Sequence, residues 1–271
     1  MRIVRTIADL RRTLAPLRLQ TLIGFVPTMG AWHSGHVALI HAARRRGCLV
    51  VASIFVNPAQ FNDSADLAGY PRDEARDADM AVAEGVDVLF VPTVDEIYPT
   101  GFASWVDVHG AARGFEGDLR PGHFRGVATV CLKLFHLVDP DIAFFGQKDA
   151  QQVAVIRQTI RDLRLDLEIH VVPTVREADG LAMSSRNVRL TPADRLRALA
   201  IPRALAEGLS AHRAGQDPAA AARATLDGLQ VDYADVASFD GQPTLVIAAR
   251  AGSTRLIDNV PLDHPELAGL R

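Results

Sequence analysis

The sequence predicts an α/β protein that begins with a helix-covered parallel sheet and continues into a smaller α+β domain. Apolar strand candidates alternate with helical patterns up to Pro173, and this alternation is typical of a parallel sheet. The strand candidates are rich in Val, Ile and Phe without polar alternation, as in sheets covered on both faces. A chain of 271 residues has a length at which single cores divide. We therefore expect two domains, residues 1–174 and 175–271.

Five apolar stretches are the strand candidates of the first domain, and they lie at residues 22–26, 48–56, 86–91, 141–145 and 167–172. Four segments between them carry the apolar spacing of amphipathic helices, at residues 37–46, 73–84, 126–137 and 149–163. Ligands are expected at the carboxyl ends of these strands, where parallel sheets of this kind bind them.

The character of the sequence changes after Pro173. Segments rich in Ala and Arg predict helices at residues 192–208 and 218–228. Strands are predicted at residues 231–239, 244–249 and 254–259. The polar segment TVREADGLAMSSRN, residues 174–187, contains a glycine and is expected to connect the two domains as a loop.

The composition is that of a globular protein with no general attraction for nucleic acid. Hydrophobic residues make up 48% and charged residues 23%, and the net charge is −3, whereas nucleic-acid binders usually carry a basic surplus. No apolar run approaches the roughly 18 residues of a membrane-spanning helix, and the start MRIVRTIADLRR lacks the apolar core of a signal peptide. Cys48 and Cys131 lie among apolar residues, which favours buried, reduced thiols in a cytosolic protein.

The stretch PTMGAWHSGH, residues 27–36, is the most informative about function. It lies between a strand candidate and a helical pattern, so it is expected to form a tight turn at a helix start. His33 and His36 flank Gly35 there, and both can face an anion such as phosphate at the positive end of the helix dipole. For a histidine pair taken alone, capping with surface exposure has about equal weight. Zinc is less favoured, because helical ligands prefer i,i+4 spacing and no third ligand is near.

Lysine is rare in this chain, which draws attention to each one. Lys133 and Lys148 are the only lysines among 29 Lys and Arg residues. The compact ammonium of lysine suits phosphate sites where the broad guanidinium of arginine does not fit. Lys148 follows a strand candidate in FFGQKDAQQ and is expected at a phosphate, whereas Lys133 lies in a helical pattern and is expected to be structural or snorkelling.

Polar side chains gather where the expected strands end. They are Asn57, Gln60, Lys148, Asp149, Gln151, Gln152, Ser184, Ser185 and Arg186. Together they are expected to form a nucleotide-sized site at the carboxyl edge of the sheet. Amide groups both donate and accept hydrogen bonds, which suits a substrate with hydroxyl or carbonyl groups. A single glutamine considered alone is more often surface.

The ordered motifs of the chain resemble the pantothenate synthetase family, whose members join pantoate to β-alanine. The resemblance runs over nearly the whole length through FVPTMGAWHSGH, SIFVNPAQF, YPRDEARD, RPGHFRGVATV, FFGQKDAQQ and TVREADGLAMSSRN. The histidine motif alone would indicate only the wider nucleotidyltransferase superfamily, which includes class I aminoacyl-tRNA synthetases. The several motifs in one order make the resemblance specific to the family.

The resemblance implies a cytoplasmic homodimer that acts on small molecules, with neither nucleic acid nor membrane as a partner. It implies a Rossmann-like amino-terminal domain that binds ATP, Mg²⁺ and pantoate, and a smaller carboxyl-terminal lid domain that closes over the active site. The implied reaction has two steps. The carboxylate of pantoate attacks the α-phosphorus of ATP, which releases pyrophosphate and leaves a pantoyl adenylate. The amine of β-alanine then displaces AMP, and the product is pantothenate, a precursor of coenzyme A.

The family's functional residues can be carried over to matching positions of this chain. His36 matches the proton donor, and the resemblance implies a catalytic set of His33, His36, Lys148 and Arg186. The residues implied to bind ATP are Met29, Gly30, His33, His36, Gly146, Gln147, Lys148, Asp149, Val175, Met183, Ser184, Ser185 and Arg186.

The resemblance also implies a substrate site and a metal ligand. Gln60 and Gln152 match the pantoate-binding glutamines, Gln60 lies toward β-alanine as well, and Asn57 completes the expected substrate-binding set. Asp77 is expected to bind Mg²⁺. An acidic residue in a helical pattern is, however, solvated surface more often than not.

Four positions depart from the family's usual pattern. Trp32 stands where leucine is common, Gln147 replaces a frequent glutamate, Ala150 replaces a frequent aromatic residue, and Arg189 stands where tyrosine is common. None of these departures removes an expected catalytic group. They concern the packing of the adenine pocket and the charge beside Lys148.

Two rival functions remain to be weighed at this stage. One is a nucleotidyltransferase that leaves AMP on a nucleotide or lipid precursor, and the pair Gln60 and Gln152 argues against it because two amides suit a small hydroxy acid. The other is a nucleotide sensor without activity. His33, His36 and Lys148 argue against a sensor, since they stabilise developing charge in a reaction.

Overall fold

The computed structural model describes residues 1–263, and these divide into two compact units. The first unit comprises Met1–Trp32, His36–Phe145 and Gln151–Val171. The second comprises His33–Gly35, Gly146–Ala150 and the chain from Val172 onward. The expected division between residues 174 and 175 stays a prediction, and residues 264–271 of the expected second domain lie outside the described residues.

The first unit is built on a six-stranded sheet with the order β1-β4-β3-β2-β5-β6. Its strands are β1 (Arg2–Val4), β2 (Ile23–Thr28), β3 (Leu49–Ile54), β4 (Val88–Phe90), β5 (Ile142–Gly146) and β6 (Glu168–Val172). β2 pairs in parallel with β3 on one side and with β5 on the other. The strand order therefore reverses between β2 and β5, which is the switch point of a doubly wound sheet. The expected Rossmann-like parallel sheet is confirmed.

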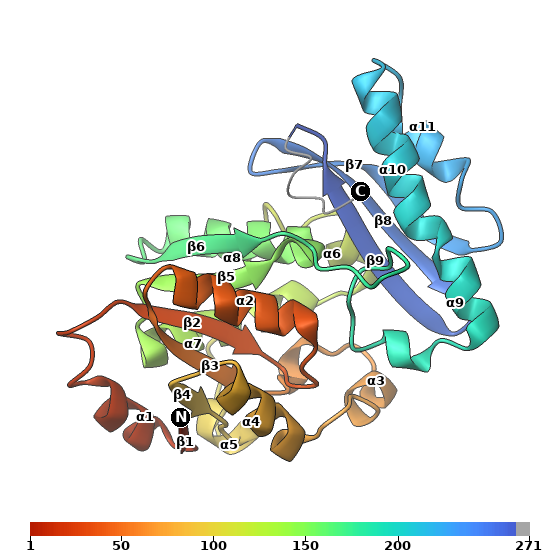
Figure 1. Cartoon of the computed structure of the whole chain (residues 1–271). Helices are drawn as coiled ribbons and strands as arrows, with labels where there is room; N and C mark the ends of the chain where they lie inside the picture. Colours follow the sequence, from red (N-terminus) through yellow and green to blue (C-terminus); the bar gives the residue numbers. More distant parts are fainter. Residues whose placement is uncertain (264–271) are drawn as a thin grey trace. The chain divides into compact units, whose positions relative to one another are not determined.

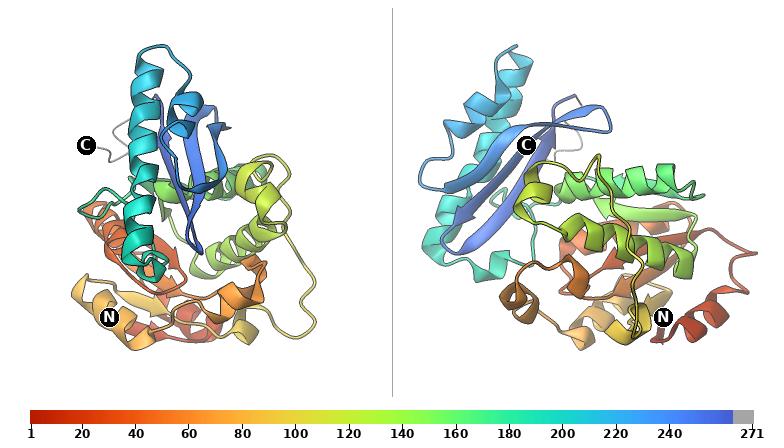
Figure 2. Two further views of the ribbon diagram at one scale, coloured as in Figure 1. Left: turned by 90° about the vertical axis from the view of Figure 1, so that its right-hand side faces the viewer. Right: turned by 180° about the vertical axis from the view of Figure 1, so that it is seen from behind.

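Helices cover both faces of this sheet. The helices are α1 (Ile7–Leu14), α2 (Ser34–Arg45), α3 (Ser64–Ala68), α4 (Glu74–Ala83), α5 (Val94–Ile97), α6 (Phe115–Leu119), α7 (His123–Val138) and α8 (Ala150–Asp162), with a 3₁₀ turn η1 (Pro58–Gln60). A further 3₁₀ turn, η2 (Gln147–Asp149), lies between β5 and α8 and belongs to the second unit. Figure 1 shows α2 in front of the sheet, and the right-hand view of Figure 2 shows α7 and α8 on the opposite face. The fully buried strand residues confirm the expectation drawn from their unbroken apolar runs.

The core of the first unit lies between the sheet and its helices. Phe25 of β2, Phe90 of β4 and Ile156 of α8 are among its fully buried side chains. The rings of Phe25 and of Phe135 from α7 meet edge to face, with ring centroids 6.5 Å apart, an arrangement that aromatic pairs favour. This packing fixes α7 against the centre of the sheet.

The second unit contains a three-stranded antiparallel sheet of β7 (Gln230–Phe239), β8 (Gln242–Ala251) and β9 (Thr254–Pro261). Asp240 and Gly241 both have positive φ between β7 and β8, as two-residue hairpins of right-twisted strands require. The helices are α9 (Pro192–Ala198), α10 (Ala200–Arg213) and α11 (Pro218–Arg223), with a 3₁₀ turn η3 (Asn187–Arg189). α10 lies along the sheet (Figure 2, left), and Leu205 of α10 and Leu245 of β8 share its core. The smaller α+β fold is confirmed.

The structure corrects two details of the sequence reading. The strand candidate at residues 22–26 is a strand, but it is not the first one. A short strand, β1 (Arg2–Val4), precedes it and pairs with β4 at the sheet edge. The single helix expected over residues 192–208 is two helices that meet at Leu199. Within residues 1–263, no helix combines the length and the apolar character needed to cross a membrane.

Both cysteines are free thiols and both are buried, as expected. Burial raises the pKa of Cys131 to about 12. Burial also raises the pKa of Cys48, although the nearby Arg46 opposes this change. Because the thiolate is the reactive form, neither thiol has the charge or the exposure that reaction requires.

We expect the two thiols to resist a disulfide reagent in the folded protein at pH 8. The protein thiols should react with the reagent at least about 100-fold more slowly in the folded protein than in guanidinium, because burial suppresses both their access and their ionisation. Absorbance measured with Ellman's reagent checks this result, and the denatured protein should yield both thiols. Rapid release of one equivalent from the folded protein would contradict it.

Candidate functional site

The turn between β2 and α2 places the histidine motif. Gly30 and Ala31 have φ values of 83° and 52°, so the backbone reverses sharply before the helix. Thr28 holds the start of the turn, because its hydroxyl accepts the N–H of Gly30 at 3.1 Å and the indole N–H of Trp32 at 2.8 Å. The same hydroxyl donates to the carbonyl of Ser53 on β3 at 2.6 Å. The turn is therefore anchored to the sheet.

His33 belongs to the second unit and accepts a hydrogen bond from the chain that follows it. Its Nδ1 accepts the N–H of Gly35 at 3.1 Å, so the neutral imidazole carries its proton on Nε2. A Cβ at position 35 would lie 2.8 Å from Cε1 of His33. Only glycine fits between the two histidines, which explains the residue type at the centre of the motif.

His36 belongs to the first unit and lies on α2, half-buried. Its imidazole stacks on the indole of Trp32 with centroids 6.3 Å apart and planes inclined by 27°. Trp32 is 1% exposed. The tryptophan that departs from the family's usual leucine thus provides an apolar wall for the expected proton donor.

The first unit also brings Asn57, Gln60 and Met29 together. The amide of Asn57 donates to Oε1 of Gln60 at 2.9 Å, and Nε2 of Gln60 lies 3.2 Å from the sulfur of Met29. Asn57 donates further to the carbonyl of Gly126 and accepts the hydroxyl of Tyr98 at 2.9 Å. The amide of Asn57 is thus engaged in holding the fold, and its expected contact with substrate stays a prediction.

Two residues that support Gln60 were not identified from the sequence. Nδ1 of His123 donates to the carbonyl of Gln60 at 2.8 Å. A Cβ at Gly126 would lie 2.3 Å from the carbonyl oxygen of Ala59, so α7 can approach this turn only with glycine there. Both lie in the motif RPGHFRGVATV, which carried the signal without indicating the contact.

The amides that follow β5 have different tasks. Gln151 is 6% exposed and holds the segment before α6, because its Nε2 donates to the carbonyls of Ala111, Arg113 and Gly114 at 3.1 Å each. Gln152 is half-buried one position further along α8. Gln151 is therefore a structural residue, and the expected pantoate contact of Gln152 stays a prediction.

In the second unit, Asn259 of β9 holds the segment that contains Lys148. Its amide donates to the carbonyl of Gln147 at 3.0 Å and to the carbonyl of Lys148 at 2.8 Å. Its oxygen accepts the side-chain amide of Gln147 at 3.0 Å. We call these three hydrogen bonds the Asn259 clasp. A glutamate at position 147 could not donate to this oxygen, so Gln147 and Asn259 form a matched pair.

Lys148 has a backbone that is fixed by the clasp and a side chain that is 19% exposed. Its Nζ lies 3.9 Å from the carboxylate of Asp149, whose side chain is 49% exposed. This pair is too long for a direct hydrogen bond. A Cβ at Gly146 would meet no atom within 4 Å, so open space lies beside the start of this segment.

The expected connecting loop at residues 174–187 is ordered by its own hydrogen bonds. The N–H of Met183 donates to the carbonyl of Val175 at 2.9 Å, and the N–H of Glu177 donates to that of Leu181 at 2.8 Å. Arg176 forms a two-pronged ion pair with Asp258 of β9 at 2.6 and 3.2 Å. The loop is thereby attached to the same strand that carries Asn259.

The end of this loop carries the residues expected at the phosphates. Ser184, Ser185 and Arg186 are all half-buried. The hydroxyl of Ser184 accepts the N–H of Arg186 at 3.2 Å, and η3 begins directly afterwards. This turn fixes the backbone on which the expected phosphate donors stand.

The second lysine is structural, as expected. The ammonium of Lys133 lies 4.4 Å from the ring centre of Phe102 and 5.7 Å from that of Tyr98, and a cation over an aromatic face is stabilised there. Burial lowers the pKa of Lys133. This leaves Lys148 as the lysine expected at a phosphate.

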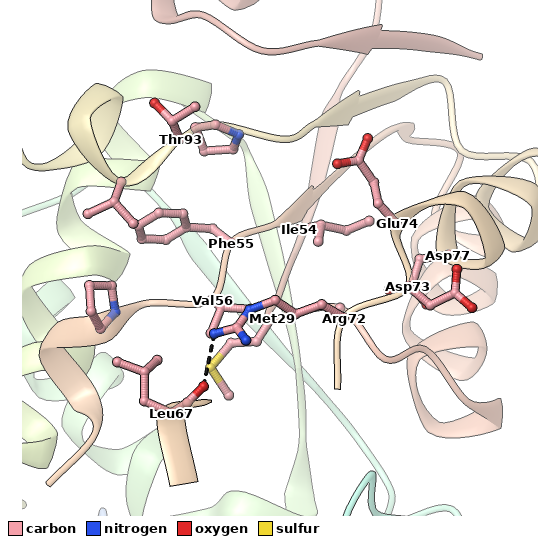
Figure 3. Close-up of a pocket in the computed structure, with 14 residues that line it drawn as sticks. Met29, Ile54, Phe55, Val56, Leu67, Arg72, Asp73, Glu74, Asp77 and Thr93 are labelled. Atoms are coloured by element: carbon pink, nitrogen blue, oxygen red, sulfur yellow. Dashed lines mark hydrogen bonds between the residues drawn. The ribbon is translucent and has the colours of Figure 1, made fainter. Parts of the chain in front are cut away.

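A pocket of 360 Å³ lies within the first unit beside the histidine turn. Figure 3 shows Met29, Val56 and Leu67 along it, with the guanidinium of Arg72 donating to the carbonyl of Leu67. The carboxylates of its wall are Asp73, Glu74 and Asp77.

Asp77, the expected metal ligand, does not lie on solvated surface. It is 1% exposed, and its two carboxylate oxygens accept the backbone N–H groups of Ala31 and Trp32 at 2.7 and 2.8 Å. Across residues 1–263, no cluster of three or more His, Cys, Asp or Glu side chains could hold a metal ion. Both oxygens of Asp77 are thus engaged with the backbone of the turn, and its expected contact with Mg²⁺ stays a prediction.

A doubly wound parallel sheet with a His-x-Gly-His turn after its switch-point strand defines the class of nucleotidyltransferase-like α/β enzymes. The profile of the pantoate-β-alanine ligase family matches residues 2–261, and the chain belongs to this family. Pantothenate synthetase of Rhizorhabdus wittichii is 51% identical, over 97% of this chain and 99% of that protein.

Two solved structures are similar over almost their whole length. Pantothenate synthetase of Thermus thermophilus has a TM-score of 0.92 at 43% identity, covering 97% of this chain and 99% of that one. The pantoate-β-alanine ligase of Francisella tularensis, crystallised with β-γ ATP and β-alanine, has a TM-score of 0.84 at 36% identity, covering 97% and 98%.

We expect Asn259→Asp to weaken the fold in a pH-dependent way. The substitution keeps the shape but sets a carboxylate against the carbonyls of Gln147 and Lys148, and two lost donors should lower the free energy of unfolding by about 2–4 kcal/mol at pH 8. The introduced carboxyl would have a raised pKa in the folded state, because only its protonated form can donate. The loss should therefore be smaller at pH 5 than at pH 8, as measured by urea unfolding.

The control for this prediction is Ser253→Ala, which changes an exposed residue in the turn before β9. It should stay within about 0.5 kcal/mol of the parent protein at both pH values. If Asn259→Asp lowers the free energy of unfolding by the same amount at both pH values, the result would argue against the clasp.

Proposed function

We propose that this chain is an ATP-dependent ligase that condenses (R)-pantoate with β-alanine to give pantothenate, a coenzyme A precursor. The observation that carries this proposal is membership of the pantoate-β-alanine ligase family across residues 2–261. A relative with 36% identity was crystallised with an ATP compound and β-alanine, which supports both ligands for this chain. The rival functions drawn from the sequence have no comparable support.

The proposed reaction proceeds through a mixed anhydride. The carboxylate of pantoate attacks the α-phosphorus of ATP and expels pyrophosphate, which leaves pantoyl adenylate. The amine of β-alanine then attacks the acyl carbon, and AMP departs. Negative charge grows on the α-phosphate and on the departing pyrophosphate in the first step, so hydrogen-bond donors that are already in place lower its barrier.

For the first unit we propose a proton-donor role for His36 and substrate contacts for the amides. Stacking on buried Trp32 restricts the imidazole of His36, as a pre-positioned donor requires. Gln60 and Gln152 are proposed to bind pantoate, and Gln60 to face β-alanine as well. His123 holds the backbone carbonyl of Gln60, and Asn57 and Met29 contact its side-chain amide.

For the second unit we propose contacts with ATP from three segments. His33, with its proton on Nε2 as the bond from Gly35 requires, is proposed to donate to phosphate. Lys148 is proposed to neutralise the phosphates, with Gly146, Gln147 and Asp149 at the nucleotide and Asp149 at the ribose. The third segment supplies Val175 to the adenine through its backbone and Met183, Ser184, Ser185 and Arg186 to the phosphate side.

Magnesium belongs to this proposal only as the partner of the ATP phosphates, whose charge it reduces when bound. Both oxygens of Asp77 accept backbone N–H groups, so we assign this carboxylate to the turn. We therefore derive no step through a metal ion held by Asp77.

The remaining parts of the proposal come from the family resemblance. We propose that residues 175–271 act as a lid domain on an ATP- and pantoate-binding domain of residues 1–174. We also propose that the enzyme is a homodimer in the cytoplasm. Buried free thiols suit a reducing compartment.

The two half-reactions provide the direct test of the function. With pantoate and ATP, the protein should release pyrophosphate in an amount that matches the adenylate formed, and β-alanine should then release AMP. Coupled assays for pyrophosphate and AMP measure both steps, and omission of pantoate is the control. ATP binding without pyrophosphate release would favour a nucleotide sensor, and AMP retained on an acceptor would favour a nucleotidyltransferase.

The two lysines allow a matched test of the proposed phosphate contact. Lys148→Arg keeps the charge but replaces a compact ammonium by a planar fork, so kcat for pyrophosphate release should fall by roughly 10²-fold or more. Lys133→Arg should change kcat less than about twofold, because a guanidinium can also lie over the rings of Phe102 and Tyr98. Equal rates for Lys148→Arg and the parent would contradict the assignment.

A further inference from the structure

The carboxylate of Asp77 fills the turn that carries the histidine motif. Asp77 lies on the buried face of α4, one helical turn before Ala81. Its Oδ2 accepts the N–H of Ala31 at 2.7 Å, and its Oδ1 accepts the N–H of Trp32 at 2.8 Å. Successive backbone N–H groups in a turn of this kind form a concave anion site. Here the anion in that site is the protein's own carboxylate.

The turn depends on this anion because of its backbone conformation. Ala31 has a φ of 52°, which is unfavourable for a residue with a Cβ. Position 30 must be glycine, since a Cβ there would lie 2.9 Å from Oδ2 of Asp77. The two hydrogen bonds to Asp77 thus compensate a strained turn, and the close packing leaves little room for its movement.

The same turn determines the position of the Trp32 ring. The N–H of Trp32 is held by Asp77, and its indole N–H is held by Thr28 at 2.8 Å. With both ends of the residue fixed, the face of the indole lies against the imidazole of His36. A continuous set of contacts therefore leads from α4 to the ring of His36, entirely within the first unit.

We propose that Asp77 is a positioning residue for His36 and not a magnesium ligand. Its carboxylate fixes the backbone of Ala31 and Trp32, and the Trp32 indole fixes the imidazole. This inference rests on the proposed role of His36 in adenylate formation. The contacts involve only residues of this chain, so they can be tested separately from that role.

The first test replaces one acceptor of the carboxylate. Asp77→Asn keeps the shape, but its single oxygen can serve only one of the two N–H groups, and its amide faces the other. We expect kcat for pyrophosphate release to fall roughly 10- to 100-fold, as misplacement of a reacting group does. The KM for ATP and the dependence on Mg²⁺ should change little. Asp79→Asn, an exposed position on the same helix, is the matched control and should keep the parent kcat.

The second test observes the ring without any substrate. The chain has two tryptophans, so Trp105→Phe leaves Trp32 as the only one. Buried Trp32 should emit at short wavelength in this background, and Asp77→Asn should shift the emission to longer wavelength with neither ATP nor Mg²⁺ present. Asp79→Asn should cause no shift, and circular dichroism should show an intact fold in all variants.

Several outcomes would overturn the proposal. Recovery of turnover in Asp77→Asn at high Mg²⁺ would indicate that Asp77 is a metal ligand. Unchanged Trp32 emission in an inactive variant would show that Asp77 does not act on His36 through the Trp32 ring. A shifted emission with parent kcat would also overturn it. If His36→Ala has parent kcat as well, the failure lies in the proposed function of His36 and not in the contacts.

A measurement on the unsubstituted protein decides the matter if Asp77→Asn does not fold. The amides of Ala31 and Trp32 should exchange with solvent on the order of 10²-fold more slowly than in an unstructured peptide, because both are bonded to a buried carboxylate. Nuclear magnetic resonance can follow both amides. Exchange at the unstructured rate for either one would overturn the proposal.

Discussion

The hydrogen bonds from Ala31 and Trp32 to Asp77 keep the chain in a conformation that its own backbone does not favour. β2 ends at the switch point of the sheet, and the chain must reverse its direction there within a few residues to enter α2. Positive φ at Gly30 and Ala31 makes this reversal possible, and a buried carboxylate holds it. The position of Trp32, the start of α2 and the orientation of His36 all follow from this turn.

Buried amide groups perform a related task elsewhere in the chain. Burial without a partner is unfavourable for an amide, so each buried amide group must find complementary groups, and the groups it finds here are loop backbones. Asn57 bonds to Gln60 and to the carbonyl of Gly126, and Gln151 holds the segment before α6. The Asn259 clasp does the same for Lys148. Asn57 and Gln151, which the sequence placed at the ligand site, thus also hold neighbouring segments of the first unit in position.

The parallel sheet could be predicted because its strands are unbroken apolar runs bounded by turns, and its helices carry a regular apolar spacing. β1 escaped prediction because it is only three residues long and two of them, Arg2 and Ile3, are exposed. A short edge strand has no apolar run to reveal it. The break between α9 and α10 at Leu199 escaped for the opposite reason, since an apolar residue in a helical pattern carries no sign of a boundary.

The residues of the candidate site were named from the sequence, but their supporting contacts were not. The burial of Asp77 could not be predicted, because an acidic side chain in a helical pattern gives no local sign that it is buried. Asn259 and Asp258 were not identified at all, since their partners lie far away in the sequence. Gln147 and Asn259 are separated by 112 positions, and a pattern of local spacing cannot connect residues that far apart. The comparison with relatives establishes the family. The geometry shows which hydrogen bonds and packing contacts support the residues of the candidate site.

The Asn259 clasp has a consequence for the order in which the protein is completed during translation. The sheet of the first unit and its helices are encoded before Val172 and can begin to assemble as the ribosome releases them. The segment around Lys148 obtains its hydrogen-bond partners only when β9, near the end of the described chain, has left the exit tunnel. In a nascent chain, the sheet of the first unit can therefore form before the backbone around Lys148 has its hydrogen-bond partners from β9.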